Sequence, residues 1–135
     1  VTPEEVRVDL DANMAELAAM GVDVEKIRAF IPPYEHYTAA SNAVAVQMGL
    51  LPVNLSEGTY TNADYTTPSM KNYRSSKAIL EKFWAKEERD GLNGAIILIH
   101  PGTDPERTDK LYNHLDKMIR RLKKLGYSFG SFKEE

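Results

Sequence analysis

Four helical patterns alternate with four short apolar runs along this chain, and that alternation limits the fold more than any other feature. Apolar residues recur at helical spacing after Thr2, over residues 38–48, from Ser75 or Ser76, and after Asp104. The short runs are residues 27–31, 50–55, 95–99 and 127–132. This order favours an α/β domain with parallel strands. Four strands are too few to close a barrel of the usual size, so we expect either a small open sheet or part of a larger barrel.

Local signals mark the ends of the expected helices. Thr2 can cap the first helix, Pro3 suits its first position, and Glu5 completes a capping box. Glycines follow all four helical patterns, at Gly21, Gly49, Gly91 and Gly126. Each helix is therefore expected to end just before its glycine.

Composition excludes several classes of protein. The chain has 135 residues, 42% of them hydrophobic and 27% charged, which argues against disorder. It has no cysteine, which excludes disulfides and thiolate chemistry. A net charge of −3 without a basic stripe makes nucleic acid an unexpected partner. No apolar run approaches the about 20 residues that a membrane span requires, so no span is expected.

His100 is the sharpest candidate for chemistry. It follows the five apolar residues 95–99, which we expect to be a strand covered on both faces. Functional groups of parallel α/β domains collect at the carboxyl ends of strands, and an imidazole there is suited to proton transfer. The alternative is a histidine that is merely hydrogen-bonded in its loop. His114, within a helical pattern, is expected to be a plain surface histidine.

Two further segments follow expected strands. His36 stands between Tyr34 and Tyr37 after a rigid Pro-Pro turn, and this group either stacks on a sugar or packs on its own loop. Asp64 lies in residues 56–68, which have no clear period and are expected to form a long loop. Its carboxylate either orients a histidine or forms an Asx turn.

Several catalytic motifs are missing from the sequence. There is no His-x-x-x-His pair, no cysteine cluster and no glycine-rich phosphate loop. We therefore expect no metal ligand within this chain.

The ordered segments resemble the polysaccharide deacetylase family, also called the NodB homology domain or carbohydrate esterase family four. Residues 30–34, Phe-Ile-Pro-Pro-Tyr, are similar to the family's Arg-Pro-Pro-Tyr turn, and residues 98–100, Leu-Ile-His, match its Leu-x-His motif. Residues 63–66 fall where the family has an aspartate-bearing loop, and residues 126–129 resemble its closing Gly-Tyr strand. The resemblance implies that residues 1–135 are the C-terminal half of a distorted (β/α) barrel, without the N-terminal metal-binding motifs.

The resemblance also implies roles for individual residues. His100 would protonate the departing amine, with Asp64 holding His100 in its protonated form. The backbone N–H of Tyr34 would help to stabilise the oxyanion, and Leu98 would line the pocket for the acetyl methyl group. His36 and Tyr65 are expected to contact the sugar. A divalent metal, foremost zinc, would be held by residues outside this chain.

The expected substrate is an acetylated polysaccharide, and the expected partner is the N-terminal half of the same protein. The family's substrates imply a secreted, periplasmic or cell-envelope location. One departure is Ile31, which stands where the family has an arginine. Two alternatives therefore stay open: a non-catalytic carbohydrate-binding remnant of the same fold, and an unrelated α/β domain that assembles with a partner.

Overall fold

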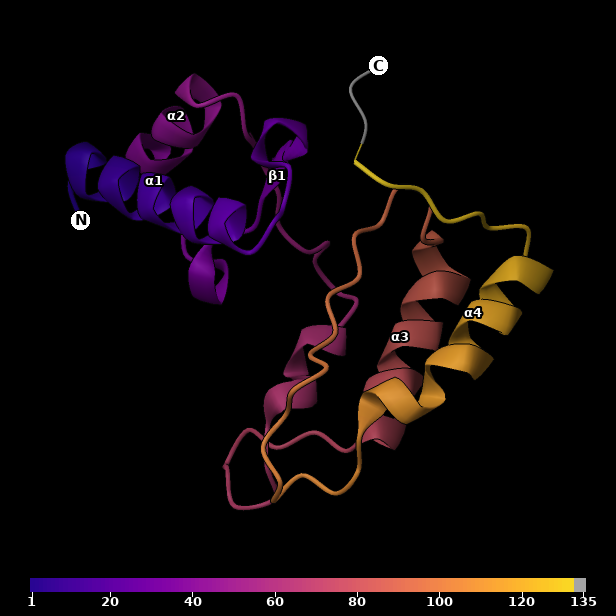
Figure 1. The fold of residues 1–135 in the computed structure, drawn as a ribbon. Coiled ribbons are helices and arrows are strands. Elements are labelled where there is room, and N and C mark those ends of the chain that lie inside the picture. The colour runs from indigo at the N-terminus through magenta and orange to yellow at the C-terminus, as the bar shows by residue number, and fades with distance from the viewer. Residues whose placement is uncertain (133–135) are drawn as a thin grey trace. The chain divides into compact units, whose positions relative to one another are not determined.

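The computed structural model describes residues 1–132 and divides into two compact units (Figure 1). Of the described residues, the first unit contains Val1–Asn54 together with Ser131 and Phe132, and the second contains Leu55–Gly130. Two hydrophobic clusters that share no residue stabilise them, one in each unit. Each unit is therefore described by itself.

The N-terminal unit combines two helices with one pair of strands. Its elements in order are α1 (Pro3–Ala19), η1 (Val24–Lys26), β1 (Ala29–Phe30), η2 (Pro33–Glu35), α2 (Ala39–Gln47) and β2 (Leu51–Pro52), where η marks a 3₁₀ helix. The capping box predicted for α1 is present, because Glu5 N–H donates to the Thr2 hydroxyl and Thr2 N–H donates to the Glu5 carboxylate. Thr38 and Ser41 form an equivalent pair at the start of α2.

The two strands of this unit are parallel. Ala29 pairs with Leu51 and Phe30 with Pro52, and α2 lies between the strands in sequence, as a crossover connection requires. Both strands are shorter than the apolar runs 27–31 and 50–55 that predicted them. Behind them, the buried side chains of the first cluster come from both helices and the chain next to β2: Leu10, Val44, Ala45 and Leu50.

The C-terminal unit is built around two helices that pack side by side (Figure 1). Its elements are η3 (Thr61–Tyr65), α3 (Ser76–Asp90), η4 (Leu111–His114) and α4 (Leu115–Lys124). Phe83 of α3 meets Met118 and Leu122 of α4 in the second cluster, with Leu92 beside them. Ser75 caps α3, and Gly91 ends it, as the sequence predicts.

Two predicted strands of the C-terminal unit are absent. Residues 95–99 and 127–132 have no ladder partner among the described residues, and the side chains of residues 95–99 are half-buried rather than fully covered. Residue 96 exchanges two hydrogen bonds with Ser56, through the backbone carbonyl and N–H of Ile96. A strand requires a series of backbone hydrogen bonds to a neighbouring strand, and contact with a single residue does not form such a ladder.

The last helix begins later than predicted. The Asp104 carboxylate accepts the N–H of Glu106, and the Asp104 carbonyl accepts the N–H of Arg107, so Asp104 forms a local turn instead of capping a helix. The helical stretch starts only at Leu111. The predicted long loop 56–68 contains the short helix η3, which places Asp64 on a structured element.

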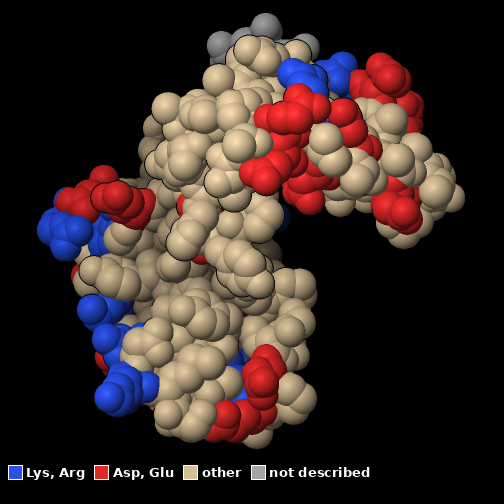
Figure 2. Space-filling view, turned by 90° about the vertical axis from the view of Figure 1, so that its left-hand side faces the viewer, with Lys and Arg blue, Asp and Glu red and all other residues tan. Residues whose placement is uncertain are grey.

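The described chain is thus a mixed helix-and-strand protein with one parallel strand pair. None of its helices within residues 1–132 has both the length and the apolar character that crossing a membrane requires. Residues 1–54 carry eight acidic and three basic side chains, whereas residues 55–130 carry ten and thirteen. On the face shown in Figure 2, neither sign forms one continuous band over the described residues.

Candidate functional site

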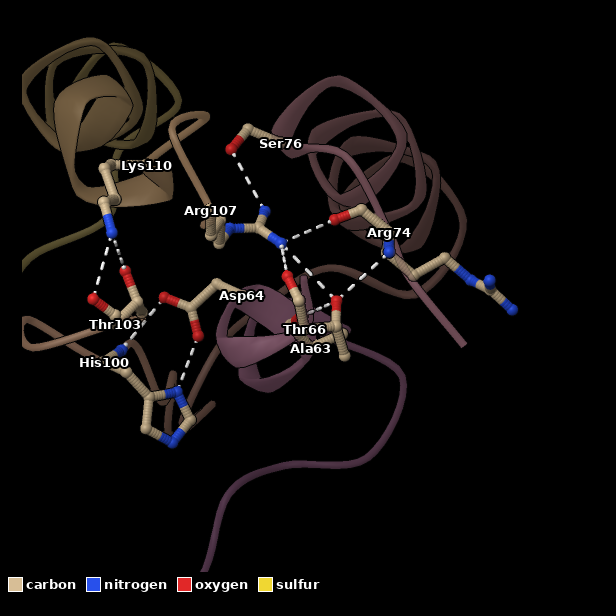
Figure 3. Close-up of polar contacts among 9 residues, drawn as sticks. All are labelled: Ala63, Asp64, Thr66, Arg74, Ser76, His100, Thr103, Arg107 and Lys110. Atoms are coloured by element: carbon tan, nitrogen blue, oxygen red, sulfur yellow. Dashed lines mark hydrogen bonds and ion pairs between the residues drawn. The ribbon is translucent and has the colours of Figure 1, made fainter. Parts of the chain in front are cut away.

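Asp64 and His100 form a hydrogen-bonded pair in the C-terminal unit (Figure 3). His100 Nδ1 lies 2.6 Å from Asp64 Oδ1, and the backbone N–H of His100 donates to Asp64 Oδ2 at 3.0 Å. Both carboxylate oxygens therefore bind the same residue. The Asp64 side chain is 1% exposed and that of His100 is 37% exposed, so the carboxylate is sequestered while the ring reaches the surface.

The carboxylate of Asp64 has no arginine or lysine as an ion-pair partner within the described residues; its only charged-group contact there is His100. A buried carboxylate must be hydrogen-bonded or paired, and His100 supplies both hydrogen bonds. This arrangement fixes the ring at Nδ1 and leaves Nε2 on the side away from Asp64 (Figure 3). The pair can therefore present one ring nitrogen for proton transfer.

Short-range contacts hold Asp64 in place. It lies in η3, and the residue that precedes this helix, Tyr60, adopts the left-handed conformation with φ 60°. After η3, the Thr66 hydroxyl donates to the Ala63 carbonyl at 2.7 Å and accepts the N–H of Arg74. The surrounding threonines are buried: Thr59, Thr61, Thr66 and Thr67. Asp64 thus lies on a short helix whose end is held by hydrogen bonds of Thr66.

Tyr65 and Leu98 lie close to the pair along the chain. The Tyr65 ring stands edge-on to the His100 imidazole, with 5.8 Å between ring centroids, and is 47% exposed. Ala95 and Ile97 pack against the second hydrophobic cluster, whereas Leu98 is half-buried and does not belong to it. Ala95 and Ile97 of this segment therefore pack on the core, whereas Leu98 lies outside the cluster.

The loop after His100 is fastened to the segment after Asp64. Glu106 accepts the N–H and the hydroxyl of Ser69, and the Asp109 carboxylate accepts the N–H of Ser76 at 2.5 Å. Within the loop, the Lys110 ammonium donates to the Thr103 carbonyl and hydroxyl and to the Asp104 carbonyl. These contacts connect the segment after Asp64 to the loop after His100.

The N-terminal unit holds the other predicted substrate-binding residues, Tyr34 and His36. Tyr34 and Glu35 have positive φ values of 55° and 56°, a region that non-glycine residues rarely adopt. Such strain costs about 1–3 kcal/mol per residue and gathers at functional sites. The N–H of Tyr34 donates no hydrogen bond to any residue among 1–132, and its side chain is 88% exposed.

A groove of about 1030 Å³ runs beside this strained turn. His36 and Tyr37 line it together with Phe30, and the carboxyl-bearing residues Asp9 and Glu35 also lie on its wall. A smaller hollow of about 360 Å³ in the C-terminal unit is lined by Leu80, Trp84 and neighbouring residues, and contains neither Asp64 nor His100.

The structure brings together Asp64, Tyr65 and His100, and it places Tyr34 and His36 in the N-terminal unit. Arg107, which is fully buried among polar groups beside this site, was not predicted from the sequence. Its position in the loop directly after His100 was the available signal, but an arginine in a polar loop ordinarily indicates a solvated side chain.

Within residues 1–132, no three His, Asp or Glu side chains converge into a group that could hold a metal ion. Comparison of the chain with protein-family models, with curated proteins and with solved structures found no match in any of the three.

Proposed function

We propose that this chain supplies the general acid of a metal-dependent deacetylase acting on an acetylated polysaccharide. The observation that carries the proposal is the 2.6 Å contact between His100 Nδ1 and a fully buried Asp64 carboxylate. A histidine oriented by a carboxylate and exposed on its other side is the arrangement that general acid–base catalysis needs. The order of sequence motifs that resembles the polysaccharide deacetylase family supports the same role.

The proton in this scheme travels through Nε2. Asp64 keeps the other ring nitrogen, Nδ1, protonated, so a protonated His100 gives up the proton on Nε2 to the departing amine. An amine is a poor leaving group until it is protonated, and a positioned acid contributes about 10²–10⁴ in rate. The partial exposure of the ring gives a substrate access to that nitrogen.

The finer parts of the proposal come from the resemblance. The chain would form the C-terminal half of a distorted (β/α) barrel, and a divalent metal such as zinc would be held by residues outside 1–135. That metal would polarise the acetyl carbonyl and activate a water molecule. The N–H of Tyr34, which has no partner among the described residues, is suited to stabilise an oxyanion, and Leu98 to contact the acetyl methyl group. The proposed location is secreted, periplasmic or at the cell envelope.

The test is a kinetic comparison of variants in the protein as its gene encodes it, with any residues that precede Val1 and with zinc supplied. Turnover is measured on acetylated chito-oligosaccharide and on acetylated xylan. We expect His100→Ala to lower kcat by about 10²–10⁴ because the acid is removed. Asp64→Asn should lower it by about 10–100-fold because the ring loses its orienting carboxylate.

His114→Ala is the matched control, since this histidine lies at the start of α4 and outside the pair. The sequence predicted a plain surface histidine, but the structure has His114 half-buried on the wall of the smaller hollow. Because it does not contact Asp64 or His100, His114→Ala should leave kcat within about twofold of the unchanged protein. A His100→Ala protein that turns over both substrates as fast as the His114→Ala control would remove the acid role from His100.

The groove of the N-terminal unit favours a second candidate, a carbohydrate-binding module without catalysis. Aromatic rings beside hydrogen-bonding carboxylates are a surface on which a sugar can stack, and Tyr37 is 56% exposed there. If this candidate is right, the chain binds chito-oligosaccharide in titration calorimetry without added metal, and Tyr37→Ala weakens binding about tenfold, the loss of about 1.4 kcal/mol. Tyr112→Ala, on η4, is the control. Absence of binding heat in the unchanged chain would exclude the candidate.

A further inference from the structure

Arg107 is a fully buried cation in the loop that follows His100. Among the described residues it has no carboxylate partner; its guanidinium is held by neutral oxygens instead. Buried arginines are ordinarily paired with an acid, because desolvation of an unpaired charge is costly. A second cost is visible at Nε, which has no hydrogen-bond partner among residues 1–132.

The contacts of Arg107 span three separate points of the chain (Figure 3). One terminal nitrogen, Nη1, donates to the Thr66 carbonyl at 2.6 Å and to the Arg74 carbonyl at 2.9 Å. The other, Nη2, reaches the Ser76 hydroxyl at 3.4 Å. The guanidinium also lies over the Tyr73 ring, 5.5 Å from its centroid. The rigid fork of a guanidinium can join these points at once, whereas a lysine ammonium is a single compact donor group.

One of these points, Thr66, lies close to Asp64 along the chain. Thr66 directly follows the η3 helix, two residues after Asp64, and its hydroxyl donates to the carbonyl of Ala63 within that helix. Arg107 itself belongs to the loop that begins at His100. The guanidinium therefore joins the segment after Asp64 to the segment after His100, without touching either side chain of the pair.

We propose that Arg107 is a positioning residue that sets the geometry of the Asp64–His100 pair. It does so by drawing the Thr66 carbonyl and the loop 100–110 together, so that both Asp64 oxygens face His100. Its consequence for turnover rests on the proposed deacetylase function, because a displaced acid loses alignment with the leaving group and a shift of about 1 Å costs about 10²-fold. Its consequence for the pair itself can be measured without any turnover.

The experiment uses nuclear magnetic resonance on the chain with Arg107→Met and with Arg107→Lys. Two signals report the pair: the tautomer of the His100 imidazole, read from its ring nitrogens, and the hydrogen exchange of the His100 N–H, which donates to Asp64. In Arg107→Met we expect exchange of that N–H to rise about 10–100-fold, as when a hydrogen bond to a charged group opens, and the ring to populate both tautomers. Amides in α3 and α4 should keep their protection.

Arg107→Lys keeps the charge but lacks the fork, so its effect should fall between those of the unchanged chain and Arg107→Met. Arg120→Met is the matched control, because Arg120 is an exposed arginine whose ion-pair partner within residues 1–132 is Asp116 on α4. It should leave both His100 signals unchanged. In the kinetic assay, Arg107→Met should lower kcat with little change in KM.

Two results would overturn the positioning role. The first is a folded Arg107→Met chain with the native tautomer and native exchange at His100. The second is loss of folding in both Arg107 variants, which would assign the residue to the stability of the whole unit. Changed His100 signals in an encoded protein that shows no deacetylation would leave the positioning role standing and count against the proposed function alone.

Discussion

Both carboxylate oxygens of Asp64 contact the same residue, His100. A single contact to Nδ1 would let the imidazole tilt about that hydrogen bond. The second contact, from the backbone N–H of His100, ties the carboxylate to the chain from which the ring projects. The ring is thereby held in one tautomer and one direction, a property that catalytic histidines share with metal-ligating ones.

Glu5 provides a pH-dependent contact at the start of α1. The hydrogen bonds from the Thr2 backbone and then from its hydroxyl hold the pKa of Glu5 below its usual value. A lowered pKa in the folded chain means that its stabilisation is present above the unfolded pKa and is lost as pH falls through the folded pKa. We expect the Thr2 amide resonance to report this loss below the ordinary pKa of a glutamate, and the dependence to vanish in Glu5→Gln. A Thr2 resonance with the same acid titration in Glu5→Gln would contradict the assignment.

Single residues of the site differ in how far the sequence reveals them. His100 was predictable because it ends the most apolar run of the chain, and Asp64 because an aspartate-bearing loop has a known place in the resemblance. Arg107 was not, since nothing in a Thr-Asp-Pro-Glu-Arg loop distinguishes a buried guanidinium from a solvated one. Its environment is made by Thr66, Arg74 and Ser76, more than thirty residues earlier in the chain.

The helices were predicted well where their end signals are local. The capping box of α1 and the serine cap and glycine stop of α3 involve residues within one turn of each other, so sequence alone specifies them. The strands were predicted poorly because a ladder depends on a partner far along the chain. The apolar character of residues 95–99 was identified correctly, but apolar character does not by itself provide a neighbouring strand.

Gly91 ends α3 in a backbone conformation that other residues rarely adopt. Its φ of 70° and ψ of 176° lie in a region that is essentially restricted to glycine. Gly91→Ala should therefore lower the free energy of unfolding by about 1–3 kcal/mol. Urea denaturation followed by the fluorescence of Trp84, the one tryptophan in the sequence, measures this in the unit that contains α3.

Gly130→Ala supplies the comparison, because that glycine has open space around its Cα and no positive φ. It should change the free energy of unfolding by less than about 0.5 kcal/mol. Equal effects of the two substitutions would show that backbone conformation at Gly91 does not limit stability.

Across the chain as a whole, the mixed helix-and-strand class was predictable from alternating periods. The parallel orientation of β1 and β2 was predicted as well and is confirmed. The half-barrel stays a prediction, because one pair of two-residue strands defines an orientation but no curvature or closure. No linker marks the boundary between the two hydrophobic clusters near Leu55. The one sign of it in the sequence is the change from an excess of acidic side chains in residues 1–54 to an excess of basic ones in residues 55–130.

The complete burial of Arg107 also has a consequence for proteolysis. Trypsin cleaves after an arginine whose side chain can enter its specificity pocket, and the side chain of Arg107 is fully enclosed in the folded unit. Cleavage between Arg107 and Thr108 must therefore wait until the guanidinium leaves its carbonyl partners. When opening and reclosing are fast, the rate of such a cut follows the population of the open form. The rate at which the fragment ending at Arg107 appears on a gel would therefore measure how often this part of the protein unfolds locally.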